Sequence, residues 1–172
     1  MLTNMKEDMS KVEKNGDVNC DFIKEIMCAD KGASDISKNF LKYGSSKEGK
    51  EIANTIIKNS TANIEEMKKL NETLQSQIKA DNEKEAEYIN DYEENLNEME
   101  SKIKDLKPSG NVEKDYLNIM IIYCNCSMKI YSNITKYSDN GEVKEKAEKK
   151  LNETKNCKDN ISKLLEKSTS KK

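Results

Sequence analysis

The chain has 172 residues, of which 36% are charged and 34% hydrophobic, with one proline, six glycines and no histidine. This length suits one domain, and the scarcity of turn and aromatic residues favours an all-α protein over a β-sandwich or barrel. The net charge of −2 and the absence of arginine exclude a basic nucleic-acid-binding surface. The absence of histidine excludes catalysis by an imidazole.

The first predicted helix covers the N-terminal residues up to about Val12, where Met5, Met9 and Val12 recur at helical spacing. The stretch "KNGDVN" follows, and its Asn-Gly pair predicts a break in the helix. The opening residues "MLTNMKEDMSKVEKNG" are too charged for the core of a signal peptide. We therefore expect a cytoplasmic protein with its five cysteines reduced.

The second predicted helix has an apolar stripe with steps of three and four residues. We expect Gly44 to end it as a left-handed cap and a capping box, Ser45 to Glu48, to start the third helix. The two stripes consist of Phe22, Ile26, Ala29, Ala33, Ile36, Phe40 and Tyr43, and of Ala53, Ile57, Ser60, Ile64, Met67, Leu74 and Ile78. The short loop between them predicts an antiparallel hairpin.

The stretch from about residue 47 to residue 106 contains no strong helix breaker before Pro108. We therefore predict that the third and fourth helices run on as one long rod. Residues 79–94, "KADNEKEAEYINDYEE", would be the exposed middle of that rod.

A shift of 94 residues aligns residues 1–78 with 95–172 without a gap and gives seventeen identical positions. Composition alone would give roughly seven, which indicates a duplication. We predict a first repeat at 1–78, a helical linker at 79–94 and a second repeat at 95–172, together forming one compact domain. The second repeat has its own stripes, Tyr116, Met120, Tyr123, Ser127, Ile130, Ile134 and Tyr137, then Ala147, Leu151, Thr154, Ile161 and Leu165. The capping box Asp139 to Glu142 separates them.

Two hairpins that each expose an apolar stripe can bury one another as a four-helix bundle. The short first segment of each repeat would then be an extra helix lying across that bundle. The longest uncharged apolar run, Tyr116 to Met128, is too short to span a bilayer, so we expect no membrane partner.

The stretches "DFIKEIMCADKGASDIS" and "DYLNIMIIYCNCSMKIY" resemble the signature of the domain of unknown function 305 family. That signature contains a His-His pair. "EIANTIIKNSTANIEEM", from Glu51 to Met67, is similar to the second part of the signature, which contains Gln-x-x-Glu. The resemblance covers nearly the whole chain and implies a ferritin-like four-helix bundle in tandem form. It also implies a metal function, since some members of the family are linked to copper.

The positions of the family's candidate metal ligands hold other residue types in this chain. The histidine pairs fall on Ala29 and Asp30 and on Tyr123 and Cys124, the glutamine on Ser60 and Thr154, and the glutamate on Asn63 and Cys157. The metal function of the family therefore does not carry over residue by residue. On the sequence alone, we expect the hydroxyls of Ser60 and Thr154 to bond the carbonyls four residues before them.

The stretch "MIIYCNCSM" has Met120, Cys124 and Met128 at steps of four residues, which places them along one helix face. Thiolate and thioether groups are soft donors suited to Cu(I). With Asp30 at the pseudo-symmetric position, and Cys28 or Cys157 from another helix, these residues form a candidate metal site. The alternative is that methionine and cysteine fill the core. Residues i and i+2 of a helix diverge, so Cys126 should not share a ligand with Cys124.

The leading hypothesis from the sequence is a non-catalytic, ferritin-like helical-bundle protein with a degenerate metal site and no cofactor. Its role would be binding or structural, through an unknown protein partner or as a homodimer formed through a helix face. The alternative hypothesis is a soft-metal protein that binds Cu(I) with the Cys and Met ligands named above.

Overall fold

The computed structural model describes residues 2–76, 78 and 80–169, except for the side chains of 2–4 and 169. The first residue of the predicted linker, 79, and the last residues of the predicted second repeat, 170–172, lie outside the described residues. The described residues form helices and no strand, so the all-α prediction is confirmed. The helices are α1 (Leu2–Ser10), α2 (Val18–Tyr43), α3 (Lys47–Gln75), α4 (Asn82–Asp105), α5 (Val112–Tyr137) and α6 (Gly141–Thr169). Within these ranges, no helix is long and apolar enough to cross a membrane.

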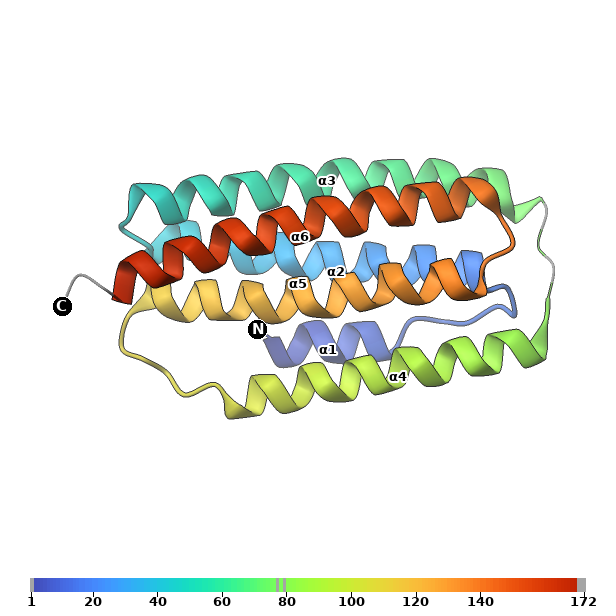
Figure 1. Cartoon of the computed structure of the whole chain (residues 1–172), viewed down its shortest axis with the longest axis horizontal. Coiled ribbons are helices and arrows are strands. Elements are labelled where there is room, and N and C mark those ends of the chain that lie inside the picture. The colour runs from blue at the N-terminus through green and yellow to red at the C-terminus, as the bar shows by residue number, and fades with distance from the viewer. Residues whose placement is uncertain (1, 77, 79, 170–172) are drawn as a thin grey trace.

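The helices form three layers that run along the long axis of the molecule (Figure 1). Helices α2 and α3 pack as one antiparallel hairpin, and α5 and α6 pack as a second. The hairpins meet mainly along α2 and α5, which form the middle layer, whereas α3 and α6 barely touch on the outer side. On the opposite side α1 packs on α2, α4 packs on α5, and α1 and α4 contact each other.

Apolar stripes from all six helices meet in one core. Every stripe residue predicted for α5, including Tyr123 and Ser127, is buried. In α2 the prediction fails at its last residue, Tyr43, which is 69% exposed because the helix ends there. In α3 it fails at Ile57 and Ile64, which are only half-buried because the neighbouring Ile56 and Asn63 take the buried positions. It also fails at Ile78, which is 45% exposed and lies beyond the helix end at Gln75.

The helix boundaries follow the 94-residue register of the sequence repeat. Val112 and Tyr137 bound α5 as Val18 and Tyr43 bound α2, and both helices have 26 residues. Helices α3 and α6 both have 29 residues and begin 94 residues apart, at Lys47 and Gly141. The two hairpins are therefore built from segments of equal length.

The loops before α2 and α5 also share their construction. Gly16 and Gly110 both adopt a left-handed backbone, with φ of 88° and 76°. Asp21 accepts a hydrogen bond from the Asn15 backbone N–H at 3.0 Å, and the equivalent Asp115 accepts one from Ser109 at 2.9 Å. In each copy a helix carboxylate thus fixes the loop that precedes it.

The left-handed backbone of Gly110 yields a first prediction. A Cβ at this position would meet no atom within 4 Å, so only backbone strain opposes Gly110→Ala. We expect a loss of about 1 kcal/mol of unfolding free energy, measured by urea denaturation. Gly141→Ala is the matched control, because it also has open space but no positive φ; we expect it to be neutral or stabilising by about 0.5 kcal/mol. Equal losses in both variants would contradict the strain argument.

The predicted long rod is wrong, because α3 ends at Gln75 and α4 begins at Asn82. The Asp81 side chain caps the new helix by accepting a hydrogen bond from the Lys84 N–H. Most described residues of the linker are exposed, as predicted, but one face of it is not. Tyr88 and Tyr92 are buried, and the Tyr92 hydroxyl donates to the Met9 carbonyl at 3.2 Å. Most of the linker forms the first half of α4, and α4 covers the middle layer. With 24 residues, α4 is also longer than the short extra helix that the sequence predicts.

Two predicted helix ends also need correction. Gly44 has φ −70° and ψ 142°, which is an extended and not a left-handed conformation. Ser46 caps α3 by accepting from the Gly49 N–H, and Asn140 accepts from the Val143 N–H at the start of α6. Both caps lie one residue after the predicted positions, Ser45 and Asp139. Several nearby polar residues could cap each helix, so sequence pattern alone did not decide between them.

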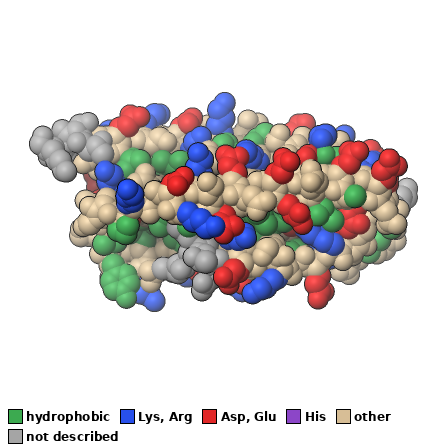
Figure 2. All heavy atoms as spheres, turned by 90° about the horizontal axis from the view of Figure 1, so that it is seen from below, with side chains coloured by type: hydrophobic (Ala, Val, Ile, Leu, Met, Phe, Trp, Pro, Cys, Tyr) green, Lys and Arg blue, Asp and Glu red, His purple; other side chains and the backbone are tan. Residues whose placement is uncertain are grey.

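The outer face of α1 and α4 has no patch of a single charge sign in the view from below. Figure 2 shows lysine and acidic side chains intermingled along this face. The ion pairs Lys6–Glu100 at 3.1 Å and Lys104–Glu100 at 2.9 Å lie on these two helices.

Candidate functional site

A partly open cavity of about 60 Å³ lies between all four helices of the two hairpins. Its lining consists of Asp30, Ile56, Asn59, Ser60, Asn63, Tyr123, Cys124, Tyr131, Lys150, Glu153, Thr154 and Cys157. Every position that the family resemblance marks as a ligand position lies in this lining, except Ala29. The structure thus gathers seven residues that are far apart in the sequence.

Asp30 is the centre of a hydrogen-bond network on the α2 and α3 side of the cavity. Its side chain is buried at 4% exposure. One carboxylate oxygen accepts from the Tyr123 hydroxyl at 2.6 Å and from the Ser60 hydroxyl at 3.3 Å. The other accepts from the Asn63 amide. Burial raises the pKa of Asp30, while the three hydrogen bonds act in the opposite direction because they favour the charged form.

Asn63 extends this network to α5, since its amide nitrogen also donates to the Tyr131 hydroxyl at 3.1 Å. The Asn63 amide oxygen has no hydrogen-bond partner among the described residues, although the residue is only 3% exposed. The prediction for Ser60 is wrong, because its hydroxyl bonds Asp30 and not a carbonyl of its own helix. Thr154 lies in the cavity lining.

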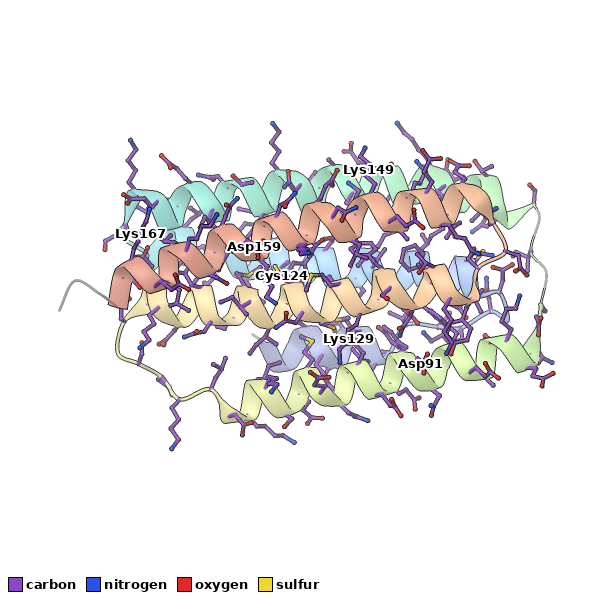
Figure 3. The ribbon with its side chains drawn as sticks, viewed as in Figure 1. Asp91, Cys124, Lys129, Lys149, Asp159 and Lys167 are labelled. Carbon is purple, nitrogen blue, oxygen red and sulfur yellow. The ribbon has the colours of Figure 1, made fainter. Side chains whose placement is uncertain are left out.

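The α5 and α6 side of the cavity carries two thiols, Cys124 and Cys157. Cys124 is buried, Cys157 is half-buried, and Figure 3 shows Cys124 in the space between α5 and α6. Both thiols line the cavity, and each shifts the pKa of the other. The interaction with Cys157, together with burial, raises the pKa of Cys124, and the same interaction lowers the pKa of Cys157. Cys157 is therefore the more acidic and the more accessible thiol of the pair.

The other cysteine candidates face elsewhere. Cys126 points towards α4, where the Asn95 amide donates to its sulfur at 3.4 Å and to its carbonyl at 3.0 Å. The predicted divergence of Cys124 and Cys126 is thus observed. Cys28 is outside the cavity lining. Burial is the main cause of its raised pKa, and the charge of Asp8 on α1 is the second cause. Cys28 therefore lies on the α1 side of α2.

The two methionines of the candidate metal site are also outside the cavity lining. Met120 is fully buried and Met128 is half-buried. Within residues 2–76, 78 and 80–169, no group of three or more Cys, Asp or Glu side chains is placed to hold a metal ion. Both oxygens of Asp30 already accept hydrogen bonds. The residues present therefore do not fit a carboxylate-rich metal centre, and only the two thiols remain together as soft donors.

A groove of about 760 Å³ between α3 and α6 leads from the surface to this cavity. Asn59, Lys150, Glu153 and Cys157 line both spaces. At the mouth the Lys150 ammonium pairs with Glu153 at 3.1 Å and with Glu66 at 3.6 Å. The cavity is thus reached past an ion pair from the side on which the hairpins barely touch.

Sequence reasoning missed a second buried polar cluster, centred on Glu25. Its fully buried carboxylate pairs with the Lys14 ammonium and accepts from the Tyr88 hydroxyl. Burial raises the pKa of Glu25 to about 7, against the effect of Lys14. Nearby, burial and a hydrogen bond with Glu85 raise the pKa of Asp21 to about 6. The one available signal was an acidic residue between the stripe positions of α2.

Fold and cavity together define a helical-bundle protein with a polar, thiol-containing cavity at the meeting point of two hairpins. The family model "Domain of unknown function (DUF305)" matches residues 19–164 in one span, and the chain belongs to this family. The match begins within the first predicted repeat and ends within the second. No curated protein and no solved structure matches the chain.

Proposed function

We propose that this protein is a non-catalytic, ferritin-like helical-bundle protein with a binding or structural role and a degenerate metal site. The proposal rests on the three hydrogen bonds that the Asp30 carboxylate accepts. The hydrogen bonds from Tyr123, Ser60 and Asn63 use three of about four acceptor positions of the Asp30 carboxylate and fix its orientation, which leaves little of it available to an ion. Such a network stabilises the cavity from within.

The repeated helix boundaries support descent from a duplicated hairpin, with each copy supplying equivalent positions to the cavity. The two copies have then diverged in chemistry. The first contributes Asp30, Ser60 and Asn63, which hydrogen-bond, and the second contributes the thiols of Cys124 and Cys157. A tandem origin therefore explains why the lost ligand positions still meet at one place.

The second candidate function is binding of Cu(I), and the adjacency of Cys124 and Cys157 favours it. Two thiols that line one cavity offer a soft donor pair, and thiolates select Cu(I) over harder ions. Asp30, Met120, Met128 and Cys28 would not be ligands in this version, since the first is hydrogen-bonded and the others lie outside the cavity lining.

Cu(I) loading separates the two candidates. The reduced protein would be loaded anaerobically with Cu(I), competed with a strong chelator and analysed for retained copper. We expect wild-type protein to retain no stoichiometric copper. Retention of one equivalent that is lost in Cys124→Ser and kept in Cys126→Ser would overturn the leading proposal. Cys126→Ser is the matched control, because it removes a buried thiol of the same helix that faces α4.

A homodimer formed through a helix face stays a prediction. Sedimentation velocity over a range of protein concentrations tests it directly, and a monomer at every concentration would remove it.

A further inference from the structure

We propose that Cys157 and Cys124 form a reactive thiol pair, in which Cys157 is attacked by small disulfides and Cys124 resolves the product into a disulfide between α5 and α6. This inference is independent of the proposed function, because it needs neither a metal nor a partner protein.

Position is the first argument. The two thiols come from neighbouring helices that pack closely along their lengths, and both line the same cavity. Each thiol also shifts the pKa of the other, in agreement with their shared place in the lining. A disulfide requires the sulfurs to approach to about 2 Å, and the proposal predicts that rotation of the two side chains brings them together.

Access is the second argument, and it differs between the two thiols. Cys157 is half-buried and lines the wide groove between α3 and α6 as well as the cavity. Cys124 is buried and lines only the inner cavity. A small reagent that enters the groove therefore meets Cys157 first. An accessible thiol of lowered pKa beside a second thiol is the usual arrangement of a redox-reactive pair.

The reaction balances with a low-molecular-weight disulfide, RSSR, as the oxidant. The Cys157 thiolate attacks one sulfur of RSSR, which forms a mixed disulfide and releases RS⁻. Cys124 then loses its proton to that thiolate and attacks the Cys157 sulfur, which forms the Cys124–Cys157 bond and releases a second RS⁻. The protein dithiol is oxidised by two electrons, and RSSR is reduced to two thiols.

The remaining cysteines lack this arrangement. Cys20 and Cys126 are buried in the core, and Cys126 faces the Asn95 amide. Cys28 lies on the α1 side of α2, away from the groove lining. The structure therefore restricts the reaction to one pair, although five thiols are present.

The test uses the reduced full chain with oxidised glutathione as the probe. After a timed incubation, all free thiols are alkylated in denaturant at acidic pH, where thiol–disulfide exchange is slow, and the protein is digested without reductant. Mass spectrometry should then find the Cys124 peptide linked to the Cys157 peptide in wild type. In Cys124→Ser we expect the reaction to stop at a mixed disulfide between glutathione and Cys157.

Cys126→Ser is the matched control and should form the Cys124–Cys157 link as wild type does. Circular dichroism of each variant before the incubation shows that the helices are intact. A wild-type protein in which Cys157 stays free, or stops at the mixed disulfide while Cys124 remains alkylatable, would overturn the proposal. So would cross-links distributed equally over other cysteine pairs. None of these outcomes depends on copper, so failure here leaves the proposed function standing.

Discussion

Replacement of Asp30 with alanine should destabilise the protein by about 4 kcal/mol, the largest loss that we expect from a single substitution. The carboxylate is buried at 4% exposure and accepts from Tyr123, Ser60 and Asn63. Its removal leaves three buried donors without an acceptor, and each unsatisfied donor costs about 1–3 kcal/mol. Urea denaturation followed by circular dichroism at 222 nm, the usual helix signal, measures the loss.

Two further variants make this prediction specific. Asp30→Asn keeps an acceptor oxygen of similar shape, so the loss should be smaller, about 1–2 kcal/mol. Asp35→Ala removes an aspartate of the same helix that is 56% exposed and pairs with Lys38 at 3.2 Å. Its effect should stay within about 0.5 kcal/mol, because exposed ion pairs contribute little. If Asp30→Ala cost no more than Asp35→Ala, the hydrogen-bond network would not stabilise the bundle.

Lys14→Met should destabilise the protein in a pH-dependent way. Burial places the folded-state pKa of Glu25 at about 7, above its unfolded value of about 4.3. The folded state therefore binds this proton more tightly. The stability that the protonated carboxyl contributes is full below about pH 4 and is lost as the pH rises towards 7. Lys14 limits this loss by pairing with the ionised form.

The lysine therefore matters most where Glu25 is charged. At pH 8 we expect Lys14→Met to cost about 2–3 kcal/mol, because it leaves a buried carboxylate without its counter-ion. At pH 5, where the wild-type carboxyl is already protonated, the cost should fall below about 1 kcal/mol. Urea denaturation at both pH values measures the difference.

Lys47→Met is the matched control for this substitution. Lys47 is 86% exposed and pairs with Glu51 at 3.9 Å, so we expect less than about 0.5 kcal/mol at either pH. An equal loss for Lys14→Met at pH 5 and pH 8 would show that Lys14 acts through packing and not through the charge of Glu25.

The sequence predicts the helices well where the information is local. Apolar steps of three and four residues locate the core stripes, and the 94-residue repeat links the two halves. The break after Gln75 was not predicted, because no proline or glycine marks it and a single cap, Asp81, starts the next helix. Caps depend on the path of the backbone, which the residue pattern alone does not determine.

The candidate site was predicted only in part. Some of its residues are far apart in the sequence, and others that share a helix face are too far apart along the helix axis to meet. The family resemblance located positions such as Asp30 and Cys157, which the structure then brings together. The stripe from Met120 to Met128 was a poor guide, since a step of four residues advances about 6 Å along the helix axis. The Glu25 cluster escaped prediction because its partners Lys14 and Tyr88 come from separate segments of the chain.

The unequal contacts between the hairpins have a mechanical consequence. On one side the molecule is braced, because α1 and α4 contact each other and each packs on a different hairpin. On the other side α3 and α6 make few contacts, and Glu66 of α3 joins them through ion pairs with Lys146 at 2.9 Å and Lys150 at 3.6 Å. A small rotation of one hairpin against the other, with α2 and α5 as the axis, would widen or narrow the groove without disturbing the packing inside either hairpin. Such a rotation would act on the polar cavity, because the groove and the cavity share part of their lining.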